Sequence, residues 1–92
     1  MLEFEWDAAK SRANIKKHGV SFEESATVFG DPNSLTIPDA QHSGTEKRWV
    51  ILGRSIAGRL LVVVCTERGE RIRLISARPA SRKERLVYEE NS

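Results

Sequence analysis

The sequence has 92 residues, of which 39% are hydrophobic and 30% are charged. A chain of this length is expected to form a single domain over residues 1–92 and to bury only about 60–65% of the surface that its unfolded form exposes. No apolar stretch approaches the roughly 20 residues that cross a bilayer, and the chain does not open with a basic segment followed by an apolar run. One cysteine cannot form an internal disulfide. These features argue against a membrane or secreted protein and favour a cytoplasmic one.

Charge is distributed unevenly between the two halves of the chain. Residues 1–46 hold 4 Lys and Arg against 8 Asp and Glu, whereas residues 47–92 hold 11 against 5. The net charges are therefore −4 and +6, and most cations of the second half are arginines, which bind phosphate through two nitrogens and stack on bases. A nucleic-acid partner is the first expectation, and a plain solvated charged surface is the alternative.

Helix signals dominate the first third of the chain. Asp7 can cap a helix that Gly19 ends, and Ser21 with Glu24 forms a capping box that opens a second helix. A Gly-Asp-Pro-Asn sequence then breaks the pattern ahead of a short β-like stretch. The elements expected in this part are helices over about residues 8–18 and 22–29 and a strand at 34–37.

The rest of the chain predicts three strands and a final helix. Turn sequences that contain glycine separate three β-like stretches, Pro79 ends the last of them, and Ser81 with Glu84 forms a second capping box. The elements expected here are strands at about 47–54, 59–66 and 71–78 and a helix that ends near residue 90. Together the elements predict an α+β fold with two N-terminal helices, a four-stranded, mainly antiparallel sheet and a C-terminal helix.

Turn lengths give an expected register for these three strands. Four-residue turns pair Arg54 with Arg59 and Thr66 with Arg71. One face of the sheet is then apolar in its middle and is expected to lie under the helices; it carries Arg48, Val50, Leu52, Leu61, Val63, Cys65, Ile72 and Leu74. The other face, which suits RNA because arginines lie beside an aromatic ring, carries Trp49, Ile51, Val62, Val64, Thr66, Arg71, Arg73 and Ile75. A slip of one residue exchanges the two faces.

A series of short motifs covers nearly the whole chain. In chain order they are Phe4-Glu5-Trp6-Asp7, Lys10, Asn14, Lys17 to Glu24, Asp39 with His42-Ser43, Glu46 with Arg48, Gly58-Arg59, Thr66-Glu67-Arg68, Ile72 to Ala80, Glu84-Arg85 and Tyr88. In this order and spacing they resemble the BrnT toxins of type II toxin–antitoxin systems. The resemblance implies a RelE-like fold, cleavage of RNA without the ribosome, and inhibition of translation and growth. It also implies a hetero-oligomer with a BrnA-type antitoxin that binds operator DNA.

Cleavage of RNA without a metal needs a base for the 2′-hydroxyl, cations beside the phosphate and an acid for the leaving 5′-oxygen. The sequence has no HExxH, CxxC or Walker-type motif, so neither a metal nor a cofactor is expected. Arg68 and Arg78, at the two ends of the last strand, are the candidate catalytic cations and are expected to converge with Arg73 on one phosphate. His42 and Glu70 are the candidates for proton transfer.

The remaining cations of the basic half are candidates for holding RNA in place. The expected RNA-binding residues are Lys47, Arg48, Trp49, Arg71 and Arg73. Each has a plain structural alternative: surface ion pairs for the arginines, a solvated strand end for Lys47, and a seal over the sheet for Trp49. Tyr88 is a further candidate for acid or base. The competing function is a nucleic-acid-binding regulatory module without catalysis, and a purely structural partner of the antitoxin is a third possibility.

Overall fold

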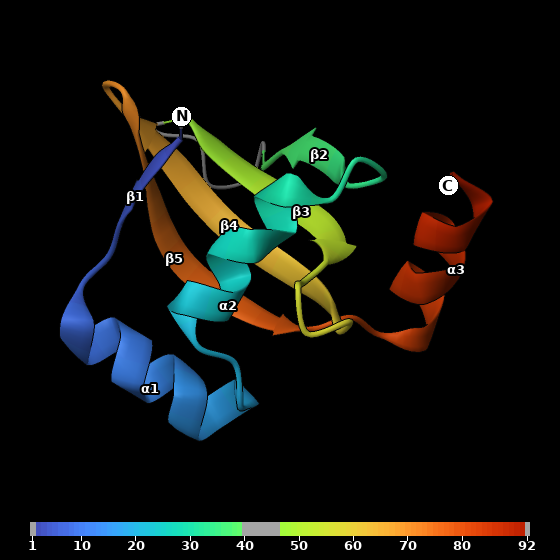
Figure 1. Cartoon of the computed structure of the whole chain (residues 1–92), viewed down its shortest axis with the longest axis horizontal. Coiled ribbons are helices and arrows are strands. Elements are labelled where there is room, and N and C mark those ends of the chain that lie inside the picture. The colour runs from blue at the N-terminus through green and yellow to red at the C-terminus, as the bar shows by residue number, and fades with distance from the viewer. Residues whose placement is uncertain (1, 40–46, 92) are drawn as a thin grey trace.

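A computed structural model describes residues 2–39 and 47–91 (Figure 1). Its elements in chain order are β1 (Glu3–Glu5), α1 (Ala8–His18), α2 (Phe22–Thr27), the 3₁₀ turn η1 (Val28–Gly30), β2 (Leu35–Pro38), β3 (Arg48–Arg54), β4 (Leu60–Arg68), β5 (Arg71–Pro79) and α3 (Arg82–Glu90). All the expected helices and strands are present, with ends within about two residues of those expected. The strand β1 was not expected.

The strands form one mixed sheet in the order β1-β5-β4-β3-β2. β1 runs parallel to β5, and the other neighbours are antiparallel. The sheet therefore has five strands, and the expectation of four was wrong by one. A segment of three residues gives almost no periodic pattern, so β1 is defined by its pairing with a strand near the other end of the chain.

Two apolar clusters lie on opposite faces of the sheet. The helices α1 and α2 and the turn η1 cover the first face, which we call the helix face, and α3 packs on the second (Figure 1). Buried residues of the helix-face cluster are Val20, Phe22, Val28, Ile51, Leu61, Val63, Cys65, Leu74 and Ala77. Those of the smaller cluster under α3 are Leu52, Leu60, Val62 and Tyr88.

Local hydrogen bonds explain where the helices begin and end. The Asp7 carboxylate accepts a hydrogen bond from the backbone of the first turn of α1, and Gly19 ends α1 in the left-handed conformation with φ of 70°. Ser21 caps α2, but Glu24 directs its carboxylate to Arg59 and Ser55 rather than closing the expected capping box. That contact ties α2 to the β3–β4 turn.

The register of β3 against β4 differs from the expected one by a single residue. Ser55 donates its backbone N–H to Arg59, so the loop holds three residues and Gly58 takes the left-handed conformation with φ of 84°. Because side chains alternate along a strand, this difference exchanges the two faces of β3. Trp49 and Ile51 therefore lie on the helix face, whereas Arg48, Val50 and Leu52 point the other way. The expected placement of β3 was wrong.

The β4–β5 hairpin keeps the expected faces near its turn. Arg68 pairs with Arg71 across a two-residue turn, and Thr66 pairs with Arg73 instead of Arg71. A shift of two residues leaves each side chain on the face that was expected. Further along, a β-bulge opposite the Val64–Cys65 step shifts the register by one residue. Beyond the bulge, Arg78 points to the same face as Arg73.

Asn14 of α1 holds β5 just past this bulge. Its side-chain amide donates to the carbonyl of Ala77 at 2.9 Å and to that of Val20 at 2.8 Å, and its oxygen accepts from the Ala77 N–H at 3.1 Å. The short β1 pairs only with residues 71–73 of β5, so Asn14 serves the backbone edge that β1 leaves open. Ala77 is thereby fixed under α1, and the next residue, Arg78, points away from it.

Candidate functional site

Besides Arg54, which lies over the Tyr88 ring of α3, the face of the sheet opposite α1 and α2 carries five arginines, and we call it the arginine face. They are Arg48, Arg68, Arg71, Arg73 and Arg78. The strands β3, β4 and β5 supply them, and α3 packs on the end of this face near Leu52 and Leu60. The corrected orientation of β3 brings Arg48 to this face, and the bulge in the β4–β5 pairing brings Arg78.

One row of side chains crosses the sheet at the centre of the arginine face. Arg48 pairs with Thr66, Thr66 with Arg73, and Arg73 with Glu5 of β1. Arg73 donates to the Glu5 carboxylate at 3.0 Å, and both side chains are 28% exposed. A half-buried carboxylate beside a half-buried guanidinium places an acceptor of protons next to a cation, which is the combination that phosphate chemistry needs.

This row also holds polar atoms without partners in the described part of the chain. The Nε of Arg48 and the hydroxyl of Thr66 are both buried and neither has a hydrogen-bond partner there. Thr66 itself is only 2% exposed. Buried polar groups are nearly always satisfied in folded proteins, so these two neighbouring atoms can accept or donate further hydrogen bonds on this face.

A second row lies at the turn end of the same face. Arg68 pairs with Arg71, and Arg71 with Glu3, whose carboxylate lies 3.4 Å from the Arg71 guanidinium. These side chains are more exposed than the central row, so their ion pair contributes little to stability and is available for exchange with another anion.

Arg78 lies at the far end of the arginine face. It pairs with Val62, six residues before Arg68 along β4. At about 3.4 Å per residue, the backbones of Arg68 and Arg78 are about 20 Å apart. The expectation that these two arginines and Arg73 converge on one phosphate was therefore wrong, because the residues follow one another along the strand. They line a track that suits several successive phosphates.

Glu84 of α3 holds the Arg78 side chain. Both terminal nitrogens of the guanidinium donate to the Glu84 carboxylate at 2.8 Å, and the same carboxylate accepts from the backbone of Ser81 to close the capping box at the start of α3. The Arg78 guanidinium lowers the pKa of Glu84 to about 2. This two-pronged contact has the geometry that arginine also uses for phosphate.

The position of α3 is set by a contact to the loop after η1. The Tyr88 hydroxyl donates to Asp31 at 2.7 Å, and Arg54 lies 5.5 Å from the centre of the Tyr88 ring. Its hydrogen bond to Asp31 raises the pKa of Tyr88. Tyr88 is therefore committed to docking α3, which makes it a poor candidate for proton transfer.

The other residues singled out in the sequence have diverse positions. Lys47 is exposed just before β3, and Glu70 lies in the β4–β5 turn beside a groove of the helix face. Trp49 lines the same groove, so its expected position among the arginines was wrong. His42 lies outside the described residues.

Sequence reasoning missed three members of this site: Glu5, Thr66 as a central position, and Glu84. Glu5 could have been found only from the pairing of β1, and Glu84 was assigned to a capping box and, in the alternative interpretation, to a surface ion pair with an arginine. Within residues 2–39 and 47–91, no three His, Cys, Asp or Glu side chains lie close enough together to hold a metal ion. In the same ranges no helix is both long and apolar enough to span a membrane.

A comparison with models of protein families matches residues 6–84 to the BrnT ribonuclease toxins of type II toxin–antitoxin systems. The chain belongs to the BrnT family. The match runs from the residue before the α1 cap to Glu84, and so includes Arg48, Arg68, Arg71, Arg73 and Arg78. Membership of a type II family implies an RNA target and an antitoxin partner.

Comparison with solved structures agrees with this family. The fold is similar to that of the ribonuclease toxin BrnT of Brucella abortus, known from a crystal structure at 1.1 Å resolution. The TM-score is 0.69 at 22% sequence identity, with 89% of this chain and 100% of the other chain covered. No curated protein matches the chain in a sequence search.

Proposed function

We propose that this BrnT-family chain is an endoribonuclease that cuts RNA on its arginine face, without the ribosome and without a metal ion. The observation that carries the proposal is the row formed by Arg48, Thr66, Arg73 and Glu5, which joins cations, a carboxylate and unpartnered polar atoms. Inhibition of translation and growth follows from RNA cleavage, and a BrnA-type antitoxin that binds operator DNA neutralises the toxin.

The arginines bind the RNA backbone and stabilise the negative charge that develops on the phosphate during cleavage. As the 2′-oxygen attacks, negative charge grows on the phosphate, and guanidinium groups already in place gain interaction energy. Arg73 belongs at the reacting phosphate because it lies at the centre of the face beside Glu5. Arg68 and Arg71 toward the β4–β5 turn, Arg78 toward the far end, and Arg48 on the β3 side of the central row hold neighbouring phosphates.

Proton transfer is assigned to carboxylates and to His42. Glu5 is the described carboxylate on the central row, and it can accept the proton of the 2′-hydroxyl. His42, in the segment between β2 and β3, is the candidate acid for the leaving 5′-oxygen because its ordinary pKa lies near neutrality. Glu70 is the alternative base, although it lies beside the groove of the helix face.

Single-turnover cleavage of a labelled RNA in EDTA tests the proposal. Arg73→Ala should lose about 100- to 1000-fold in rate, the usual cost of removing one donor aimed at the developing charge, and Arg78→Ala should lose less, mainly through weaker RNA binding. Lysine at either position should restore only part of the rate, because it keeps the charge but not the two-pronged geometry. Arg12→Ala, at an exposed position of α1, is the matched control and should cleave normally. Equal rates in all three alanine variants, with thermal melts showing folded protein, would contradict the proposal.

Two further outcomes separate the alternatives. RNA binding without cleavage favours the regulatory module, and activity that needs an added divalent ion contradicts the metal-free reaction. A growth test decides the toxin assignment: expression of this chain alone should arrest growth, and expression together with the neighbouring reading frame should relieve the arrest.

The salt dependence of RNA binding tests the role of the arginine face separately from cleavage. If five arginines each release about 0.7 counterion from a single strand, raising salt from 50 to 200 mM weakens binding by about 100-fold. A binding constant that stays constant over this range would show that the arginines do not hold the RNA backbone.

A further inference from the structure

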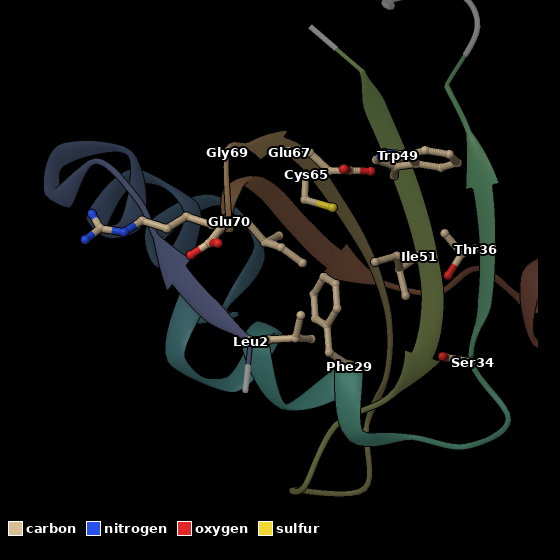
Figure 2. Close-up of a pocket in the computed structure, with 12 residues that line it drawn as sticks. Leu2, Phe29, Ser34, Thr36, Trp49, Ile51, Cys65, Glu67, Gly69 and Glu70 are labelled. Carbon is tan, nitrogen blue, oxygen red and sulfur yellow. The ribbon is translucent and has the colours of Figure 1, made fainter.

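A groove of about 530 Å³ lies on the helix face and reaches the β4–β5 turn, where Arg71 joins its rim. Figure 2 shows Leu2 and Phe29 on one side of it and Trp49 on the other, with Ile51 and Cys65 forming part of its floor. Its volume falls within the range of about 300–1000 Å³ typical of ligand sites.

The groove exists because the helices cover only part of their face of the sheet. α1 and α2 pack against β5, and η1 packs against β3, toward the end of the sheet where Arg78 and Arg54 lie. Toward the β4–β5 turn, the described elements leave the face uncovered. The apolar side chains that remain partly open to solvent there are Leu2, Phe29, Trp49 and Ile72, above a floor of buried Ile51 and Cys65, so the groove offers a small apolar socket.

Two features of the groove define its ligand. The indole Nε1 of Trp49 is buried and has no hydrogen-bond partner in the described part of the chain, so the ligand should bring an acceptor such as a backbone carbonyl. The charged groups at the rim are Glu67, Glu70 and Arg71, and Glu3 adds a third carboxylate 3.4 Å from Arg71. The rim is therefore acidic, which repels RNA and attracts a cationic segment.

We propose that this groove anchors the antitoxin, through a large apolar side chain flanked by lysine or arginine. The inference rests on the proposed function only in that a type II toxin has a protein antitoxin. The apolar side chain fills the space between Phe29 and Trp49, a carbonyl of the same segment accepts from the Trp49 indole, and the neighbouring cation pairs with Glu67. A segment held here passes the β4–β5 turn, beside Arg68, to reach the arginine face.

The anchor and the RNA track thus have opposite charge requirements. An acidic segment suits the arginine face, whereas the anchor requires a basic and apolar one. The two surfaces share only Arg71 among the residues named, so the antitoxin can make its first contact at a surface that RNA leaves largely open.

A matched pair of leucine variants tests the anchor. Leu2 lines the groove and is 52% exposed, whereas Leu86 lies on α3 and is 54% exposed. The probe is the purified product of the neighbouring reading frame that relieves growth arrest, titrated into the toxin by calorimetry. Leu2→Lys should weaken this binding by about 10- to 100-fold, the loss expected when one leucine contact is replaced by charge repulsion. Leu86→Lys should bind normally.

Two more variants test the polar features of the groove. Trp49→Phe keeps an aromatic ring but removes the N–H, and should weaken binding by about 3- to 10-fold. Glu67→Lys should weaken it as well, whereas Glu90→Lys, the same charge change at an exposed position of α3, should not. RNA cleavage by Leu2→Lys and Glu67→Lys should equal that of the wild type.

The outcomes distinguish failure of the anchor from failure of the function. Normal antitoxin binding by Leu2→Lys and Glu67→Lys, or loss of binding in Leu86→Lys instead, overturns the anchor while RNA cleavage stands. A change in the sedimentation of the free toxin on Leu2→Lys means that a second copy of the chain occupies the groove, and also overturns it. If the wild type neither cleaves RNA nor arrests growth, the proposed function itself is contradicted.

Discussion

Replacing Asn14 by leucine should remove the clamp that fixes β5 beside Arg78. The Asn14 side chain is only 7% exposed and makes three hydrogen bonds, to the carbonyls of Val20 and Ala77 and from the Ala77 N–H. Leucine branches at the same carbon as asparagine and is the larger side chain, so the variant removes these bonds without opening a cavity. Three buried backbone groups then lose their partner.

The expected loss of stability is large for a chain of this size. Each buried polar group left without a partner costs about 1–3 kcal/mol, and partial access of water to the carbonyls brings the sum to about 3–5 kcal/mol. A domain of this length has a total free energy of unfolding of about 5–14 kcal/mol. The melting temperature should therefore fall by about 15–30 °C.

Urea denaturation and thermal melts measure this loss, and Arg12→Leu, at an exposed position of the same helix, is the control. The amide of Ala77 should also exchange its hydrogen faster in the Asn14→Leu variant, because its acceptor is gone. Because Arg78 follows Ala77 directly, cleavage at a temperature where the variant remains folded should be slower than that of the wild type. A loss below about 1 kcal/mol, or one no larger than that of Arg12→Leu, would refute the reasoning.

Three other substitutions follow from the same structure. Glu84→Gln should lower the free energy of unfolding by at most about 1 kcal/mol at neutral pH, because solvent screens the contact to Arg78. Arg78 lowers the pKa of Glu84 from 4.5 to about 2, so denaturation curves should show the stability difference between wild type and variant above pH 4.5 and lose it toward pH 2. Tyr88→Phe should cost about 1 kcal/mol and expose α3 to proteolysis. Gly53→Ala should cost about 1–3 kcal/mol in urea denaturation, because the added Cβ would lie 2.7 Å from Val28.

Much of the local structure could be predicted from the sequence. The Asp7 and Ser21 caps and Gly19 gave the limits of the first two helices, and all four expected strands occur close to the expected positions. The excess of arginine in the second half and the order of the motifs indicated an RNA-directed toxin family. These signals are local: a cap acts within one helical turn, and composition needs no geometry at all.

The site depended on details that one strand cannot specify. A loop of three residues rather than four, with Gly58 in the left-handed conformation, decided that Arg48 joins the arginine face and that Trp49 leaves it. A bulge in β5 decided that Arg78 also joins the arginine face. Each detail shifts the register by one residue, and such a shift changes the face of every side chain beyond it.

Long-range contacts decided the rest. Glu5 meets Arg73 only because β1 adds to the edge of β5, and Asn14 holds Ala77 across 63 residues of sequence. The sequence by itself determined the helices, the strand segments, the charge of each half and the family. The tertiary structure alone decided which charges share a face and which apolar residues remain uncovered, because both depend on pairing between segments that have no local signal for each other.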